Sequence, residues 1–282
     1  MINNSMPIII GGNGGSGTRV VAEILIRSGV YLGYDLNESN DNLLFTYLFK
    51  HPYRFNKRID VINSKHKDLF ILHEKLIFGK FPTRIRDILN VLRSGWDHAC
   101  NYYDCKWVLE RLINKIRFKK NVISLFWGWK EPHTIFFLSE IKAHYPNAKF
   151  ILVMRNGLDM AYTKTDQQMK YWGSYYKIDS KNLGPKNKFE FWYRSNLKAI
   201  NMASDIFDEK FLLLKLEELC LNRDTLMRKL FEFVGLNINE ILPEVWSIPQ
   251  LPESYGRYRK YDTNWIDSDV KRKLRELGYE YN

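Results

Sequence analysis

Hydrophobic positions along the chain fall into two patterns, short continuous apolar runs and longer stretches with apolar residues three and four apart. The strongest short runs are residues 7–12, 149–154 and 211–216, and a weaker one is residues 125–129. Runs of this length predict buried β-strands. Helical spacing occupies residues 18–28, 133–145, 185–207 and 222–234, and a further helix is expected just past Arg155. Strands that alternate with helices predict a parallel β-sheet with helices on both faces.

This alternation stops between residue 35 and about residue 120. Aromatic and charged residues mix there, and helical spacing recurs at residues 42–50, 68–78, 85–92 and 106–116 without a convincing strand. No linker rich in proline, glycine or serine divides the chain. We therefore predict a single α/β domain over residues 1–282, with a helical insertion at about residues 40–120.

Composition and charge narrow the classes of protein that fit. The chain has 282 residues, 45% of them hydrophobic and 27% charged, which is typical of a globular protein. Lysine and arginine number 43 against 32 aspartate and glutamate residues, and the net charge of +11 favours anionic partners over neutral ones. Lysines scattered over a solvated surface are the alternative interpretation of this charge. No apolar run approaches the ~20 residues of a membrane span, so we expect none.

The cysteines indicate a reducing compartment. Cys100, Cys105 and Cys220 are few and odd in number, and their spacing matches no zinc site. We expect reduced thiols and a cytoplasmic protein, since no signal peptide pattern opens the sequence. A disulfide between Cys100 and Cys105 is the alternative.

A glycine-rich loop, GGNGGSG at residues 11–17, joins the first predicted strand to the first helix. Backbone N–H groups in such a loop can point at one anion, and the helix N-terminus adds the positive end of its dipole. The sequence therefore predicts a phosphate site, and a turn without a ligand is the alternative. The candidate binding residues are Gly14, Gly15, Ser16, Gly17, Thr18 and Arg19.

Two familiar nucleotide loops can be compared with this segment. Counted from Gly12, the G-x-x-x-x-G-K-[ST] pattern finds Thr18 in place of its lysine and Arg19 in place of its hydroxyl, which disfavours a Mg-nucleotide hydrolase. The G-x-G-x-x-G pattern is met, with Asp35 downstream, so a Rossmann-type oxidoreductase with a second strand ending at Asp35 stays open.

A third loop type fits more residues. The run Gly15-Ser16-Gly17-Thr18 resembles the 5′-phosphosulfate loop of sulfotransferases that use 3′-phosphoadenosine 5′-phosphosulfate (PAPS). Residues 145–163 resemble the segment of that family in which a strand ends in an arginine and a hydroxyl residue lies eight positions later. Here Arg155 and Thr163 hold those positions. The resemblance implies that they bind the 3′-phosphate, and arginine suits this role because it binds phosphate bidentately.

Two shorter segments extend the resemblance. WKEPH at residues 129–133 is similar to the family's K-x-P segment, which implies that Lys130 lies near the transferred sulfuryl group. YGRYRK at residues 255–260 is similar to its G-R-x-[RK] segment, which implies that Gly256 and Arg257 close over the phosphate end of the nucleotide. The resemblance also implies a P-loop nucleotide-kinase-like fold. The helices from about residue 43 to residue 120 match no segment of the family.

The resemblance implies a sulfotransferase that passes the sulfuryl group of PAPS to a hydroxyl or amine by in-line displacement, leaving 3′,5′-ADP and needing no metal. A general base can take the proton of the acceptor, and the candidates are Glu38, Asp35 and His133. Gly15 stands where the family usually has lysine or arginine, so Lys130 or Arg19 must supply the cation that meets the leaving phosphate. If neither does, the chain is a catalytically silent nucleotide- or polyanion-binding protein.

The acceptor is expected to be a small molecule or a glycan, and no nucleic acid partner is expected. The helical insertion follows Asp35 and Glu38, so we expect it to form one wall of the acceptor site. Its basic residues would favour an acidic or polyhydroxylated acceptor; they include Arg54, Lys57, Arg84 and Arg86. The sequence makes no prediction of oligomeric state.

Overall fold

The computed structural model describes residues 6–51, 64–101, 103–118, 126–164 and 166–281. Its centre is a parallel sheet with the strand order β2-β1-β3-β4 among these residues. The strands are β1 (Ile8–Gly12), β2 (Gly128–Lys130), β3 (Lys149–Met154) and β4 (Phe211–Lys215). The strand β1 pairs with β2 on one side and with β3 on the other, so the strand order reverses at β1. Ligands of open α/β sheets bind outside the carboxyl ends of the strands at such a point.

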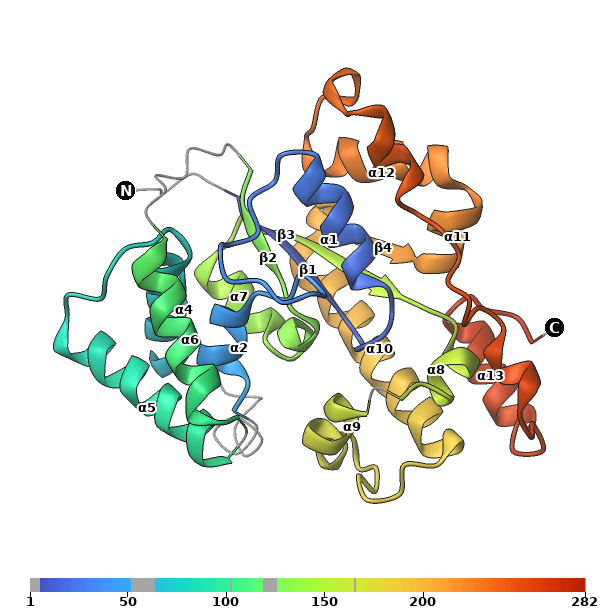
Figure 1. The fold of residues 1–282 in the computed structure, drawn as a ribbon. Helices are drawn as coiled ribbons and strands as arrows, with labels where there is room; N and C mark the ends of the chain where they lie inside the picture. Colours follow the sequence, from blue (N-terminus) through green and yellow to red (C-terminus); the bar gives the residue numbers. More distant parts are fainter. Residues whose placement is uncertain (1–5, 52–63, 102, 119–125, 165, 282) are drawn as a thin grey trace.

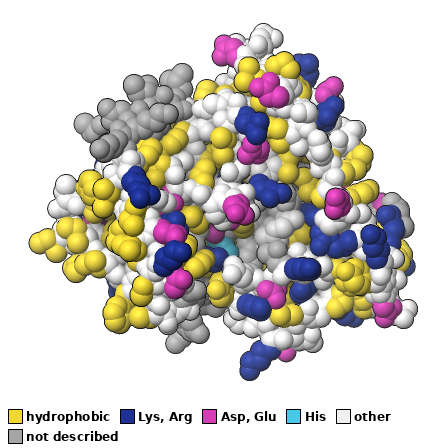
Figure 2. Space-filling view, in the orientation of Figure 1, with side chains coloured by type: hydrophobic (Ala, Val, Ile, Leu, Met, Phe, Trp, Pro, Cys, Tyr) yellow, Lys and Arg dark blue, Asp and Glu magenta, His cyan; other side chains and the backbone are white. Residues whose placement is uncertain are grey.

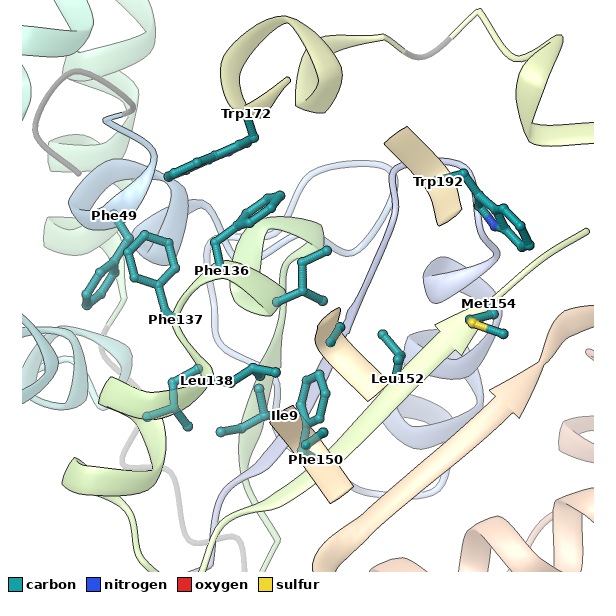
Figure 3. Close-up of a cluster of buried hydrophobic side chains, with 14 of the residues drawn as sticks. Ile9, Phe49, Phe136, Phe137, Leu138, Phe150, Leu152, Met154, Trp172 and Trp192 are labelled. Carbon is teal, nitrogen blue, oxygen red and sulfur yellow. The ribbon is translucent and has the colours of Figure 1, made fainter. Parts of the chain in front are cut away.

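Alternate residues of each strand enter two separate cores. Ile8 and Ile10 pack with helices on one face of the sheet, whereas Ile9 packs on the other. On the first face lie α1 (Thr18–Arg27) and α12 (Arg223–Val234). On the second face lie α7 (Leu138–His144) and α10 (Pro185–Phe207). The larger core contains aromatic side chains such as Phe137, Phe150 and Trp172 (Figure 3). The predicted parallel sheet with helices on both faces is therefore confirmed.

The insertion between β1 and β2 is helical, as predicted. It contains α2 (Leu43–Phe49), α4 (Ser64–Ile77), α5 (Ile85–Asn101) and α6 (Cys105–Arg117), and α4 to α6 lie together beside the sheet (Figure 1). The helix α5 continues well past residue 92, where the sequence prediction ended it. In this extension Gly95 lets α5 pack closely, because a Cβ built there would lie 2.5 Å from the Tyr47 hydroxyl and 3.2 Å from Val108 Cγ1 of α6.

Three further differences from the sequence prediction concern local structure. Residues 133–145 are not one helix, because a 3₁₀-helix (Pro132–Phe136) precedes α7. The short helices α8 (Gly157–Ala161), α9 (Gln167–Trp172), α11 (Leu216–Leu221) and α13 (Ser268–Glu276) complete the fold, and α9, α11 and α13 were not predicted. Asp35 follows no strand in the described chain, only an isolated bridge at Tyr31, so the second strand required by a Rossmann-type oxidoreductase is absent there.

The three cysteines are free thiols, as expected, and Cys100 and Cys105 form no disulfide. Within the part of the chain that the structure describes, no helix is both long enough and apolar enough to cross a membrane.

Candidate functional site

A cleft of about 430 Å³ opens at the carboxyl ends of β1, β2 and β3. Its volume lies in the usual range for small-molecule sites. Predicted residues from three separate segments line it: Gly14, Gly15, Gly17, Thr18, Arg19, Lys130, His133 and Arg155. Figure 2 shows the molecule in the orientation of Figure 1, and basic and acidic side chains lie next to each other around the middle of the face in view. The fold therefore brings most of the predicted site into one cavity.

The glycine loop leaves the N-terminus of α1 open to an anion. The N-cap residue Gly17 has a φ of 95° and no side chain to cap the helix, and the first turn carries no acidic residue. The free N–H groups and the helix dipole are therefore not neutralised by the helix itself. The Ser16 hydroxyl is buried and has no hydrogen-bond partner among the described residues, although Ser16 does not line the cleft.

Two loop N–H groups are already used inside the protein, and that of Ser16 donates to the Asn13 carbonyl at 2.9 Å. The backbone N–H of Gly14 donates to Gln168 Oε1 at 2.6 Å, and Gln168 Nε2 donates to the Gly12 carbonyl at 3.3 Å. Gln168, from α9, thus ties the loop to a helix that sequence analysis did not predict. This contact orients the loop and makes Gln168 a further candidate site residue.

Arg155 follows β3 directly and lines the cleft with only 5% of its surface exposed. Its Nη2 donates to the Ser254 carbonyl at 2.6 Å and to the Ser254 hydroxyl at 3.0 Å, while its Nε is buried without a described partner. A buried guanidinium with an unused N–H group suits an anionic ligand. Ser254 lines the same cleft and was not predicted.

The basic segment at residues 255–260 packs against α8, the helix that follows Arg155. Asp159, on α8, accepts the backbone N–H of Gly256 at 2.8 Å and that of Tyr258 at 3.3 Å. Arg257 is thereby held close to Arg155, and burial together with the Arg155 charge lowers the pKa of Arg257. Two arginines held this close favour an anion between them or beside them. Neither Gly256 nor Arg257 lines the main cleft in this structure.

Thr163 lies beside the glycine loop. It lines a small adjoining cavity together with Gly14, and its Oγ1 would be 3.4 Å from a Cβ built on Gly15. The hydroxyl and the guanidinium that the resemblance pairs on one phosphate therefore line neighbouring cavities. Their common role in binding a 3′-phosphate stays a prediction.

Lys130, at the end of β2, is almost fully buried and already has a counter-charge. Its Nζ contacts Asp41 Oδ1 at 2.5 Å and the Ser39 carbonyl at 2.9 Å, and all three residues line the cleft. The lysine predicted to act in catalysis therefore lines the cleft, but its ammonium group is already paired with the carboxylate of Asp41. Asp41 was not predicted, although it lies only three positions after the candidate Glu38. Arg19, the other candidate cation, is exposed at the cleft.

His133 is held by the carboxylate of Glu131. The distance from His133 Nδ1 to Glu131 Oε1 is 3.1 Å, and the backbone N–H of His133 also donates to this carboxylate. A hydrogen on Nδ1 donates to Glu131, which leaves Nε2 as an acceptor; Nε2 is buried, lacks a described partner, and belongs to a residue that lines the cleft. Burial lowers the pKa of His133, so the imidazole is neutral near pH 7.

Lys50 lines the same cleft as Glu131 and His133. Its Nζ donates to Gln167 Oε1 at 3.2 Å, and the charge of Glu131 helps to keep its pKa raised despite burial. Lys50 directly follows α2 and, together with Asp41, is what the insertion contributes to the cleft, because none of the described cleft-lining residues comes from α4, α5 or α6. Among the described residues, the insertion therefore forms a wall only through residues 41 and 50, and Arg84 and Arg86 do not line the cleft. Arg54 and Lys57 lie outside the described residues.

The other two candidate bases do not reach the cleft. Asp35 is buried in an ion pair with Arg111, with 2.6 Å between Oδ2 and Nε, and it accepts a hydrogen bond from Asn114. Burial raises the pKa of Asp35, and these two partners oppose the change. Glu38 is exposed and does not line the cleft. The geometry gives Asp35 the role of fixing α6 to the loop between α1 and α2.

Most of the cleft residues that sequence analysis missed are hydrogen-bond or ion-pair partners of residues that it predicted. The main omissions are Asp41, Lys50, Glu131, Gln167, Gln168 and Ser254. Glu131 was visible inside the quoted WKEPH segment. Lys50 ends a predicted helical segment, and the other omissions come from loops and from the short helix α9, which have no pattern of their own. Among the described residues, no three His, Cys, Asp or Glu side chains are grouped to hold a metal ion.

Comparison with known proteins assigns the family. The sulfotransferase domain of the curacin biosynthetic pathway aligns with a TM-score of 0.53 and 12% identity, over 98% of this chain and 99% of that chain. The sulfotransferase domain of the Synechococcus PCC 7002 olefin synthase aligns with a TM-score of 0.49 and 11% identity, over 99% and 96%. A search of curated proteins finds no match. The model of the sulfotransferase family matches residues 7–240, which is most of the chain, and the chain therefore belongs to the sulfotransferase family.

Proposed function

We propose that this protein is a PAPS-dependent sulfotransferase whose acceptor is a small molecule or a glycan. The observation that carries the proposal is the convergence of the open α1 N-terminus, Arg155, Lys130 and His133 on one cleft. An anion-binding loop, a buried arginine, a buried lysine and a neutral imidazole are together what sulfuryl transfer from a nucleotide requires.

The donor half of the cleft would bind the nucleotide through three groups of residues. The N–H groups at the first turn of α1 suit the 5′-phosphosulfate, because no side chain caps them and they carry the positive end of the helix dipole. Arg155, with Arg257 close to it, suits the 3′-phosphate. Charge supplied at both ends of the nucleotide would fix its orientation in the cleft.

In the transfer step, the acceptor oxygen or nitrogen attacks the sulfur as the bond from sulfur to the bridging phosphate oxygen breaks. His133 Nε2 takes the proton of the acceptor, and Glu131 stabilises the imidazolium that forms. Lys130 Nζ meets the negative charge that develops on the leaving phosphate of 3′,5′-ADP. For this, Lys130 must exchange at least part of its contact with Asp41 for the nucleotide.

The residues beside His133 indicate what the acceptor half prefers. Lys50 and Gln167 line this part of the cleft and lie within hydrogen-bond distance of each other. A buried ammonium beside an amide favours an acceptor that carries a carboxylate or several hydroxyl groups. We therefore expect acidic sugars and hydroxy acids to rank above apolar alcohols as acceptors.

The experiment that tests the proposal follows transfer of radiolabelled sulfate from PAPS to a panel of sugars, phenols and hydroxy acids. We expect a labelled product with the wild-type chain and a large loss with His133→Ala. Binding of 3′,5′-ADP without transfer to any acceptor would favour the second candidate, a catalytically silent nucleotide-binding protein. That candidate rests on Gly15 in the loop and on the Lys130–Asp41 ion pair, which together leave less free positive charge for the leaving group.

A further inference from the structure

The helices α5 and α6 direct polar side chains inward and apolar side chains outward. The buried residues of α5 include Asp87, Ser94 and His98, and those of α6 are Arg111 and Lys115. Large apolar side chains on both helices are exposed, with Trp96 at 72%. We call this set the outer apolar face: Ile85, Leu89, Leu92 and Trp96 of α5, and Leu109, Leu112 and Ile116 of α6.

The residues of the outer apolar face share one side of each helix. On α5 they lie four, seven and eleven positions after Ile85, and on α6 they lie three and seven positions after Leu109. These intervals place side chains on one side of an α-helix. In Figure 2, hydrophobic side chains gather at the left, where Figure 1 shows α4 to α6. Apolar patches of this extent on soluble proteins mark interaction surfaces.

Polar contacts on the inner side fix the rotation of both helices. Asp87 pairs with Lys75 of α4 at 2.7 Å, and Arg111 pairs with Asp35 at 2.6 Å. His98 Nε2 lies 3.0 Å from the Tyr47 carbonyl. Turning either helix to bury its apolar side would leave these buried groups unpaired, which is costly. The outward apolar side is therefore a property of the fold.

Positive charge surrounds the outer apolar face. The exposed basic residues on α5, on α6 and just before α5 are Lys80, Arg84, Arg86, Arg93, Lys106 and Arg117, whereas the exposed acidic residues there are Asp104 and Glu110. Arg86 is paired with Asp68 of α4 at 2.8 Å, and the other basic residues still outnumber the acidic ones. A second copy packed face to face would bring two basic rims together, so the charge disfavours a symmetric dimer. Helices that lie in the surface of a membrane combine an apolar side rich in Trp and Leu with basic flanks.

We propose that the outer apolar face docks the protein on the surface of a bilayer that contains anionic phospholipids. The apolar side chains enter the boundary between headgroups and acyl chains, and the basic flanks meet the lipid phosphates. Trp96 is the central anchor, since indole rings favour this depth of the membrane. The proposal is independent of sulfuryl transfer, because docking needs neither a nucleotide nor an acceptor.

The test is cosedimentation of the full chain with vesicles of phosphatidylcholine alone or mixed with phosphatidylglycerol. We expect binding to the mixed vesicles that weakens with added salt. The double variant Leu92→Ser/Trp96→Ser should lower the partition coefficient by about tenfold or more, because two apolar side chains lose their burial in lipid. The double variant Arg93→Glu/Lys106→Glu should lower it by at least about tenfold on mixed vesicles.

The matched control is Leu221→Ser, which removes a leucine that is 63% exposed on α11, on the other side of the molecule (Figure 1). It should bind vesicles like the wild type. All variants change exposed residues, so circular dichroism and thermal unfolding should match the wild type and show that each variant is folded. Unchanged binding by the folded Leu92→Ser/Trp96→Ser variant would overturn the proposal. So would a concentration-dependent dimer that this variant abolishes, because the face would then belong to a second copy.

Discussion

Arg155 is the residue on which recognition of the nucleotide most depends. Its guanidinium is buried, contacts Ser254 and Asp159, and still has an N–H group without a described partner. We predict that 3′,5′-ADP binds more tightly than AMP and that Arg155→Ala lowers its affinity by about 2–5 kcal/mol, as for truncated buried charge pairs. Calorimetry with both nucleotides measures this. Arg223→Ala, an exposed arginine on α12, is the control, and equal affinity for 3′,5′-ADP and AMP would contradict the prediction.

Lys130 should affect turnover more than nucleotide binding. Its Nζ lies at the end of β2 beside Asp41, where a developing charge on the leaving phosphate can be met. Lys130→Ala should lower kcat by about 10²–10³-fold, the usual effect of losing one transition-state donor. Steady-state kinetics with an active acceptor, together with the Kd for 3′,5′-ADP, separates the two effects. If kcat does not change, the role passes to Arg19, which also lines the cleft.

His133 and Glu131 should determine the pH dependence on the acid side. Burial lowers the pKa of His133, while the Glu131 and Asp41 charges raise it and Lys50 lowers it further. The base is the neutral form, so kcat/KM should fall as pH drops through a value below ~6.5, the ordinary pKa of histidine. Glu131→Gln keeps an acceptor for Nδ1–H but removes the charge, so this limb should move to still lower pH and kcat should fall.

A pH–rate profile of the wild type and of Glu131→Gln measures the effect. His133→Ala should abolish the limb. If the limb persists in that variant, the proton acceptor is another group.

The residues that could be predicted were those with a chemical reason to follow a strand or a glycine loop. Lys130 and Arg155 both end strands, and both line the cleft. Asp35 was a candidate base only because it lies just beyond the first helix, and it does not line the cleft, because its ion pair with Arg111 depends on how α6 folds back. Such a contact between distant segments leaves no local pattern in the sequence.

Among the helices and strands, the turn before α1 offers a test of local packing, because its last glycine is tightly confined. Gly17 has a positive φ, and a Cβ built there would lie 2.7 Å from Leu216 Cδ1. We predict that Gly17→Ala lowers the free energy of unfolding by about 1–3 kcal/mol through overpacking, in addition to about 1–2 kcal/mol of backbone strain. The shifted loop should also bind 3′,5′-ADP more weakly.

Gly29, after the other end of α1, provides the matched control. It also has a positive φ, but a Cβ there would meet nothing within 4 Å. Gly29→Ala should therefore show only the backbone strain and leave nucleotide binding unchanged. Urea unfolding and calorimetry compare the two variants, and equal losses of stability would show that the Leu216 contact is relaxed at little cost.

Periodicity predicted the long elements and missed the short ones for a physical reason. The strands β1, β3 and β4 and the helices α1, α10 and α12 have enough buried positions to produce a clear repeat. The helices α9 and α11 have six residues each, and their positions depend on contacts such as Gln168 with the glycine loop. Pro132 and the Glu131 carboxylate start a 3₁₀-helix where periodicity indicated one continuous helix.

For the chain as a whole, the net charge of +11 makes unspecific attraction of anions the main competitor of specific nucleotide binding. The two differ in geometry and in response to salt. A nucleotide with phosphates at both ends can contact the α1 N-terminus and Arg155 together, whereas heparin meets scattered surface cations that salt screens.

Thermal unfolding should therefore separate three ligands. A ligand that binds only the folded chain adds RT ln(1 + [L]/Kd), about 2.7 kcal/mol at a hundredfold excess over Kd. For a chain of this size, that corresponds to a rise of several degrees in Tm. We predict that 3′,5′-ADP gives such a rise even at moderate salt, that heparin gives one only at low salt, and that NAD gives none. Stabilisation by NAD would instead favour the interpretation of the glycine loop as a dinucleotide-binding site. Stabilisation by heparin alone would contradict nucleotide binding in the cleft. The variant Arg155→Ala identifies the site, because it should abolish stabilisation by 3′,5′-ADP and leave stabilisation by heparin unchanged.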